Sequence, residues 1–332
     1  MIRGLEAIEA PLPSSVLTVG NFDGVHRGHQ GIIARSKALA EQTAVPLAVL
    51  TFEPHPMAIV APQKAPPRLM PLDEKLAHFS RAGVDLAVVA DATPALLSLE
   101  PEAFVARIAQ RFCPRFMVEG RSFGFGLGRK GSTQTLQELG PRYGFEVQVV
   151  DPVTVDLTDQ RAAVVSSSLI RQLLAAARVH DAHLAAGHRY ALFGDVVAGH
   201  HRGTDLGFPT ANLAVQDQLV PPDGVYAGFA RPTDASSSKD LPWLAAISIG
   251  STPTFDSPGG APARQIEAHL IDTHQDLHGR RLQLEFGHWI RAQRRFESPQ
   301  ALGDQIARDV EFVRTRADGQ PEPQFRTRAS SS

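Results

Sequence analysis

The sequence has one cysteine, Cys113, in 332 residues. A single thiol cannot form an internal disulfide or a cysteine-built metal site. No run of about 18 apolar residues occurs, which excludes a membrane-spanning helix. Neither charge is in excess, since 33 Lys and Arg face 35 Asp and Glu for a net charge of -2. We therefore expect no general attraction to nucleic acid or to an anionic membrane. The N-terminal residues have no apolar signal core, which predicts a cytoplasmic protein.

The first half of the chain alternates short apolar runs with amphipathic stretches. Hydrophobic residues make up 43% of the sequence, which is typical of a folded protein, and the length suits about two domains. The runs predicted as strands are residues 16–19, 47–51, 86–90, 116–118 and 145–150. The alternation predicts an α/β, Rossmann-like domain with a parallel sheet and helices on both faces. Ligands on such sheets bind beyond the carboxyl ends of the strands, so the loops after Val19, Thr51 and Val118 matter most.

The pattern changes near Gly187. Two helices, 167–179 and 181–186, precede short strands punctuated by turns. Those strands are 190–197, 225–230, 244–249, 265–271 and 281–286. Their spacing predicts an antiparallel barrel or sandwich.

A last helix is predicted with Ser298 as N-cap and Pro299 at its first position. Its apolar face holds Leu302, Ile306, Val310 and Val313. We expect a mobile loop over 232–240 and three segments overall. These are a domain over 1–186, a domain over 187–316 and a flexible tail over 317–332.

The densest motif of the first half is Thr18-Val-Gly-Asn-Phe-Asp-Gly-Val-His-Arg-Gly-His29, which runs from a strand end into a helix. A helix N-terminus offers free N–H groups and a positive dipole end, which suit a phosphate. His26 and His29 flank Gly28, and their imidazoles could donate hydrogen bonds to a reacting phosphate. The alternative is a pair of surface or capping histidines on a tight loop.

His26-Arg-Gly-His29 resembles the nucleotidyltransferase superfamily, and Gly20-Asn-Phe-Asp-Gly-Val-His26 is similar to the adenylyltransferase module of bacterial bifunctional riboflavin kinases/FAD synthetases. Three further segments agree with that module: Thr51-Phe-Glu-Pro-His-Pro56, Phe123-Gly-Phe-Gly126 and Ser166-Ser-Ser-Leu-Ile-Arg171. The resemblance implies transfer of AMP from ATP to FMN, which gives FAD and pyrophosphate.

The resemblance also implies roles for individual residues. His26 and His29 are the implied catalytic residues. The implied contacts to ATP or phosphate are Gly20, Phe22, Gly28, Ser166, Ser167 and Arg171. The implied contacts to FMN are Asn21, Asp23, Phe52, His55, Phe123 and Phe125. From the residues alone, the serines could be a plain helix cap and the two last phenylalanines could be core residues. Ser122 departs from the Asn or Asp common in the family.

A second glycine-rich string, Gly126-Leu-Gly-Arg-Lys-Gly131, has the spacing of a dinucleotide-binding turn. Such a turn follows its strand at once, whereas Gly126 comes eight positions after Val118. A loop that closes over flavin or nucleotide fits better.

The second half contains Gly199-His-His-Arg-Gly-Thr-Asp-Leu-Gly-Phe-Pro-Thr-Ala-Asn212. In an extended segment Thr210 and Asn212 face the same side, and neutral oxygens of this kind suit magnesium when phosphates supply other ligands. The string resembles the riboflavin kinase signature, apart from Thr204, where the family often has Arg. The resemblance implies ATP or flavin contacts for Gly199, Arg202, Gly203, Gly207 and Pro209. The alternative is a Gly/Pro-rich turn.

Three downstream segments resemble the same kinase family: Pro221-Pro-Asp-Gly-Val-Tyr226, Ile249-Gly-Ser-Thr-Pro-Thr-Phe255 and Ile266-Glu-Ala-His-Leu270. Glu267 could accept the proton of a primary alcohol near a magnesium-bound γ-phosphate. A solvated strand carboxylate is the alternative. We interpret His269 as an ordinary polar residue, and Arg291, Arg294 and Arg295 as a solvated or ion-paired cluster.

The resemblance of both halves therefore implies riboflavin kinase and FMN adenylyltransferase activities that use riboflavin, FMN and ATP, make FAD, and require Mg²⁺ in both reactions. One rival is a nucleotidyltransferase for another acceptor with a regulatory barrel. The other rival is a flavin-binding protein with two inactive sites. Oligomeric state is left open.

Overall fold

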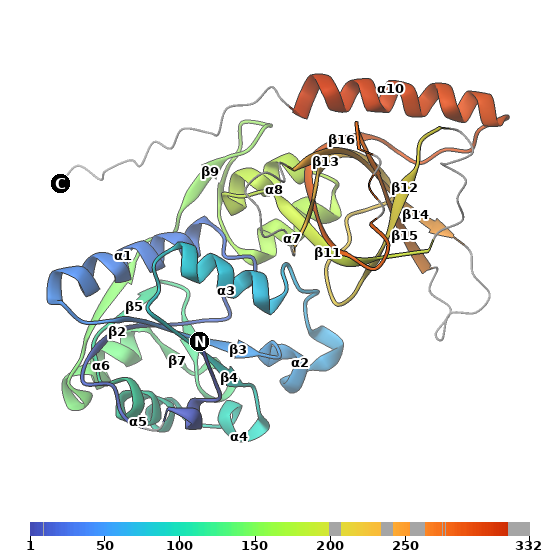
Figure 1. Ribbon diagram of the computed structural model, residues 1–332. Coiled ribbons are helices and arrows are strands. Elements are labelled where there is room, and N and C mark those ends of the chain that lie inside the picture. The colour runs from blue at the N-terminus through green and yellow to red at the C-terminus, as the bar shows by residue number, and fades with distance from the viewer. Residues whose placement is uncertain are drawn as a thin grey trace. The chain divides into compact units, whose positions relative to one another are not determined.

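The computed structural model describes residues 1–8, 10–198, 207–233, 242–252, 263–273, 275 and 277–317. By internal contacts the chain separates into two compact units, which end and begin at Ser167 and Ser168 (Figure 1). In the described part, no helix is both long and apolar enough to cross a membrane.

The first unit contains a parallel sheet with the strand order β1-β4-β3-β2-β5-β8. The strands are β1 (Ile2–Arg3), β2 (Ser15–Val19), β3 (Leu47–Glu53), β4 (Leu86–Asp91), β5 (Pro114–Gly120) and β8 (Glu146–Val150). Every neighbouring pair is parallel, so all carboxyl ends lie at one edge. In the sheet, β3 lies on one side of β2, and β5, which comes later in the chain, lies on the other side. This reversal makes the carboxyl ends of β2 and β5 the expected ligand position, and two of the loops named from the sequence, those after Val19 and Val118, begin there or near there.

Helices cover both faces of the sheet, which confirms the predicted α/β fold (Figure 1). On one face α1 (Arg27–Thr43) and α3 (Leu72–Arg81) bury Ile33, Leu39 and Phe79. On the other face α5 (Pro101–Phe112) and α6 (Thr133–Tyr143) lie over the sheet. The side chains that they bury there are Phe104, Val105, Ile108, Phe112 and Leu136. Short helices α2 (Pro56–Val60) and α4 (Pro94–Leu97) follow β3 and β4.

The glycine-rich string between residues 126 and 131 lies in a small hairpin. β6 (Gly124–Phe125) pairs antiparallel with β7 (Gly131–Ser132), and a 3-10 turn at Leu127–Arg129 joins them. A dinucleotide site needs a tight turn from a strand directly into a helix, which this hairpin excludes. A second hairpin, β9 (Thr154–Asp156) with β10 (Ala162–Val164), leads toward α7.

Two helices precede the barrel. α7 spans Ser167–Ala175 and α8 spans Val179–Ala186. The predicted helix over 167–179 is therefore too long. Ala177 has φ +56°, a left-handed conformation that ends the helix although alanine is a strong helix former.

The second unit is a closed antiparallel barrel with the order β11-β12-β15-β14-β13-β16, which confirms the predicted barrel. Its strands are β11 (Tyr190–Val197), β12 (Thr210–Val215), β13 (Gly224–Pro232), β14 (Trp243–Thr252), β15 (Ala263–Leu270) and β16 (Arg281–Arg291). Tyr226, Ile247 and Phe286 are fully buried inside it. Alternate residues therefore face outward. The predicted mobile loop over 232–240 and the predicted tail lie mostly outside the described residues.

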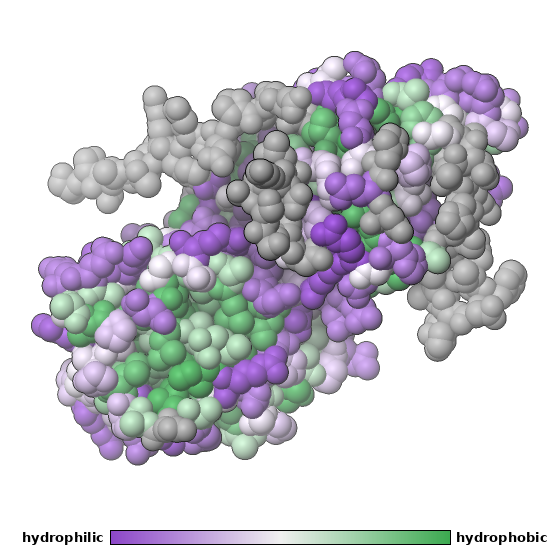
Figure 2. Space-filling view, viewed as in Figure 1, coloured by the Kyte–Doolittle hydropathy of each residue, from purple (hydrophilic) through white to green (hydrophobic). Residues whose placement is uncertain are grey.

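α10 (Pro299–Ala317) packs against the outside of the barrel. Ser298 Oγ accepts a hydrogen bond from Ala301 N at 3.1 Å, as an N-cap does. Val313 is buried against Ala227, Ala246 and Ile271. The outward side of α10 is mostly polar (Figure 2).

An ion pair fixes α10 to β16. Asp309 is 3% exposed, and Arg291 donates to its carboxylate through Nε at 3.0 Å and Nη2 at 2.7 Å. We expect Asp309→Ala to lower the free energy of unfolding by about 1.5–3 kcal/mol, because it leaves a poorly solvated guanidinium without its carboxylate. Urea unfolding measures this, with the exposed Glu311→Ala on the same helix as control. Equal midpoints for the two variants would contradict the expectation.

Candidate active sites

The loop after β2 contains the histidine pair. His26 is the N-cap of α1, and its Nδ1 accepts a hydrogen bond from His29 N at 3.3 Å. Nδ1 is therefore the acceptor, which leaves Nε2 to carry the ring proton. The two rings stack with centroids 3.6 Å apart. A Cβ on Gly28 would lie 3.1 Å from the His26 ring, so this glycine makes room for the histidine. His26 thus caps the helix through Nδ1.

His29 is a neutral imidazole in this environment. Burial holds the pKa of His29 well below 6.5, with smaller lowering effects from His26 and Lys75. Its Nδ1 is buried and has no hydrogen-bond partner among the described residues. The rings of His29 and Phe22 make an edge-to-face contact, with their centroids 5.1 Å apart. A neutral ring can donate one hydrogen bond to a phosphate oxygen without adding a full charge.

Asp23 connects three segments of the first unit. Its carboxylate is buried and accepts from Leu69 N at 3.0 Å. Its backbone oxygen accepts from Ser167 Oγ at 2.8 Å. The bond from Ser167 ties the start of α7 to the histidine loop. Ser166 directly precedes α7, and Arg171 lies one turn beyond Ser167.

The loops after β2 and β3 are in contact. Asn21 Nδ2 lies 3.2 Å from His55 Nε2, and Thr51 Oγ1 donates to Asn21 O at 3.2 Å. His55 also caps α2, since its side chain accepts from Met57 N. The contact brings two residues implied to hold FMN, Asn21 and His55, into one place.

The aromatic residues implied as ligand contacts are packed to different degrees. Phe22 is 2% exposed and has φ +48°, and its ring would lie 3.2 Å from a Cβ at Gly20. Phe125 is 6% exposed beside Phe104, at 5.8 Å between ring centroids. Phe52 and Phe123 are only partly buried against the same core. The structure therefore leaves Phe52 and Phe123 with surface for a ligand and places the rings of Phe22 and Phe125 in cores.

Lys75 is a basic residue near this site that no motif marked. It lies on α3 and is 6% exposed. Burial lowers its pKa, whereas the carboxylates of Asp23 and Glu53 act in the opposite direction. After burial and His26, Lys75 also lowers the pKa of His29 by charge repulsion. It is a buried basic side chain in the unit where a phosphate is expected.

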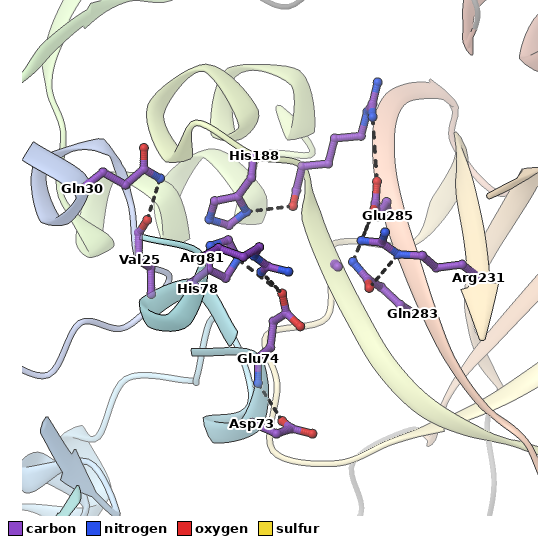
Figure 3. A network of polar contacts seen from close by, with 12 residues as sticks. Val25, Gln30, Asp73, Glu74, His78, Arg81, His188, Arg231, Gln283 and Glu285 are labelled. Carbon is purple, nitrogen blue, oxygen red and sulfur yellow. Dashed lines mark hydrogen bonds and ion pairs between the residues drawn. The ribbon is translucent and has the colours of Figure 1, made fainter. Parts of the chain in front are cut away.

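The neighbours of Lys75 along α3 form a separate ion-paired group (Figure 3). Arg81 Nη2 donates to Glu74 Oε1 at 2.6 Å, and His78 Nε2 lies 3.4 Å from the same oxygen. Arg81 is 57% exposed. The charges of this group balance one another, whereas Lys75 points into the protein.

Glu119 is a second buried titratable residue that the motifs did not mark. It is 2% exposed at the end of β5, and its Oε1 accepts from Val19 N at 2.8 Å. Burial raises the pKa of Glu119 well above 4.5, against the opposing effect of the Val19 hydrogen bond. The carboxyl group therefore holds the end of β2, directly before the histidine loop, through the hydrogen bond from Val19 N.

The raised pKa of Glu119 predicts a pH-dependent stability. Between pH 4.5 and the higher folded pKa, the folded chain binds a proton that the unfolded chain has lost. Stability from this group therefore falls as pH rises through that window, by at most about 1.4 kcal/mol per pH unit. Glu119→Gln keeps the shape and cannot ionise. We expect the stability of the variant relative to the natural protein to increase as pH rises above 4.5 toward the folded pKa of Glu119. A pH-independent difference in urea unfolding would contradict this.

On the barrel, strand register brings the predicted kinase residues together. β12 pairs with β15 so that Asn212 lies opposite Glu267, and Thr210 lies opposite His269. Ala268 is fully buried inside the barrel, so these four residues face outward. Two neutral oxygens and one carboxylate thus share one surface. This donor set fits a magnesium ion that also binds ATP phosphates.

His269 contacts the segment just before β12, a structural role that the sequence did not indicate. Its Nδ1 lies 2.9 Å from Pro209 O, and its ring meets Phe208 edge-on at 5.4 Å. Gly207, just before, has φ +83°, a conformation suited to glycine. These contacts fix the segment that leads into Thr210.

The other kinase residues named from the sequence, Gly199, Arg202 and Gly203, lie outside the described residues, as does Thr204. Two arginines of the predicted cluster have polar partners in the structure. Arg291 binds Asp309, and Arg294 Nη2 donates to Gln305 Oε1.

Comparisons with known proteins agree with the families predicted for the two halves of the chain. The FAD synthetase family model matches residues 9–168, and the riboflavin kinase family model matches residues 186–317. A bifunctional riboflavin kinase/FMN adenylyltransferase of Escherichia coli K12 is 35% identical over 311 residues, which cover 93% of this chain and 95% of that protein. The chain belongs to the bifunctional riboflavin kinase/FMN adenylyltransferase family.

Other members of the family give the same result. The protein of Pseudomonas fluorescens is 36% identical and covers 96% of this chain, with 97% of its own length. That of Bacillus subtilis is 32% identical and covers 89%, with 90% of its own length. A solved structure described as a macrolide-efflux protein from Streptococcus pneumoniae aligns with a TM-score of 0.80 at 26% identity, over 95% of this chain and 99% of that one. The chain thus has its FAD synthetase domain first and its riboflavin kinase domain second, in the order predicted from the motifs.

Proposed function

We propose that this chain phosphorylates riboflavin to FMN on the barrel and adenylylates FMN to FAD at the β2–β5 edge of the sheet. The observation that carries the proposal is the register of β12 and β15, which places the oxygen donor Asn212 opposite the carboxylate Glu267. ATP is the second substrate of both reactions. We place the boundary between the catalytic domains near residue 186 and the protein in the cytoplasm.

In the kinase reaction, Glu267 accepts the proton of the riboflavin primary alcohol. The alcohol oxygen then bonds to the γ-phosphorus of ATP, the bond to the bridging oxygen breaks, and ADP leaves. Thr210 and Asn212 would hold a magnesium ion at the phosphates. That ion, when bound, neutralises phosphate charge. The same surface would also hold the Glu267 carboxylate close to the alcohol oxygen.

In the adenylylation reaction, a phosphate oxygen of FMN bonds to the α-phosphorus of ATP and pyrophosphate leaves. Charge grows on the oxygens of the reacting phosphate. His26 and His29 would donate hydrogen bonds to those oxygens from fixed positions, and Lys75 would add positive charge. Because His29 is neutral, its contribution does not require acid conditions.

The proposal is tested with the full chain, riboflavin, ATP and magnesium, with FMN and FAD separated over time. We expect FMN first and FAD afterwards. Formation of FMN without FAD would support only the kinase assignment. Formation of neither product would indicate a flavin-binding protein. FAD from supplied FMN but no FMN from riboflavin would indicate a nucleotidyltransferase with a regulatory barrel.

A further inference from the structure

Gln265 lies beside the candidate kinase residues without belonging to the motif residues named above. It is on β15, two residues before Glu267, and therefore faces the same side of the strand. Its Nε2 lies 2.7 Å from Glu267 Oε1 and 3.1 Å from Asn212 Oδ1. One amide nitrogen with two hydrogens thus contacts both groups.

The two oxygens that Gln265 contacts are both hydrogen-bond acceptors. Asn212 and Glu267 are direct partners across β12 and β15, so their side chains start close together. Without a donor between them, a carboxylate oxygen and an amide oxygen repel each other. The Gln265 amide supplies one hydrogen to each, which allows both to stay on one small area of surface.

We propose that Gln265 is a positioning residue of the kinase site, which holds the general base Glu267 and the magnesium ligand Asn212 in one arrangement through a single amide group. This inference rests on the proposed kinase function. Gln265 itself exchanges no proton and bonds to no reacting atom. Its loss changes the orientation of two groups whose positions relative to the γ-phosphate set the rate.

The barrel offers a matched control at Gln283. On β16, Gln283 Nε2 donates to Glu285 Oε1 at 3.0 Å, again with two residues of spacing along one strand (Figure 3). Arg231 donates to Gln283 Oε1 at 3.0 Å and to Glu285 Oε1 at 2.9 Å. The same kind of pair therefore occurs on the barrel at residues given no catalytic role. A variant of Gln283 tests what loss of such a bond costs the barrel alone.

The experiment compares Gln265→Ala, Gln265→Glu and Gln283→Ala in the full chain. Riboflavin phosphorylation is followed at varied riboflavin and varied magnesium. We expect Gln265→Ala to lower kcat by about 10–100-fold and to raise the magnesium needed for half-maximal rate, with KM for riboflavin unchanged. Gln265→Glu keeps the shape but donates nothing, so we expect a loss at least as large. Gln283→Ala and all rates of FAD formation from FMN should stay normal.

Two outcomes would overturn the inference. If Gln265→Glu keeps the natural kcat, the side chain acts by its shape and not as a donor. If both Gln265 variants keep the natural kcat and magnesium requirement, it positions nothing. Glu267→Gln, measured in parallel, separates this failure from failure of the proposed function. If the Glu267→Gln variant stays active, Glu267 is not the general base and the proposed kinase function fails. If Glu267→Gln is inactive but both Gln265 variants stay active, only the positioning role of Gln265 is refuted.

Discussion

Glu267→Gln is expected to lower the rate of FMN formation from riboflavin by about 10²–10⁴-fold, the usual contribution of a general base. Glutamine keeps the size and polarity of the side chain but cannot accept the alcohol proton near neutral pH. Because Thr210 and Asn212 are the proposed magnesium ligands, affinity for ATP should change little. The rate is measured with saturating riboflavin and ATP.

The adenylylation reaction provides the control for this variant. FAD formation from supplied FMN should continue at the natural rate, since that reaction uses residues of the first unit. Near-normal riboflavin phosphorylation by Glu267→Gln would leave Glu267 as a solvated strand carboxylate, which is the alternative that the sequence left open.

For the other domain, His29→Ala should lower FAD formation from FMN by about 10²–10³-fold, the usual cost of losing one preorganised donor at a developing charge. The substitution leaves the N-cap intact, because His26 accepts from the backbone N–H of residue 29 and not from its ring. Helix α1 should therefore keep its start. The measurement is single-turnover AMP transfer with excess enzyme.

FMN formation from riboflavin is the internal control for His29→Ala and should be retained. If both activities fall equally while the variant unfolds at the natural denaturant concentration, the two reactions do not have separate sites. If neither falls, His29 has a packing role beside Phe22.

Much of the fold could be predicted because its signals are local. Buried parallel strands are continuous apolar runs, and amphipathic helices separate them, so β2 to β5 were identifiable. β1 was missed because two residues carry no period. The end of α7 was missed because its left-handed residue is Ala177, and nothing in an alanine indicates positive φ.

The residues of the candidate sites also fall into those that the sequence indicates and those that only the structure indicates. His26, His29, Asn212 and Glu267 lie in dense strings and could be named from the sequence. Gln265 resembles any polar residue of a half-exposed strand, and its meaning depends on the register of β15 with β12.

Lys75 also escaped sequence analysis, because it lies in an ordinary amphipathic helix whose burial depends on tertiary packing. Glu119 did leave a signal. A carboxylate directly after the buried Met117 and Val118 is unusual enough to mark a protonated or bound group.

The central claim is that one chain carries two separate active sites, and mixing two variants tests it most directly. Glu267→Gln alone and His29→Ala alone should each fail to make FAD from riboflavin at the natural rate. Mixed in equal amounts with riboflavin, ATP and magnesium, they should make FAD, because His29→Ala supplies FMN and Glu267→Gln adenylylates it. A mixture that forms no FAD, although each variant keeps its own remaining activity, would contradict two independent sites.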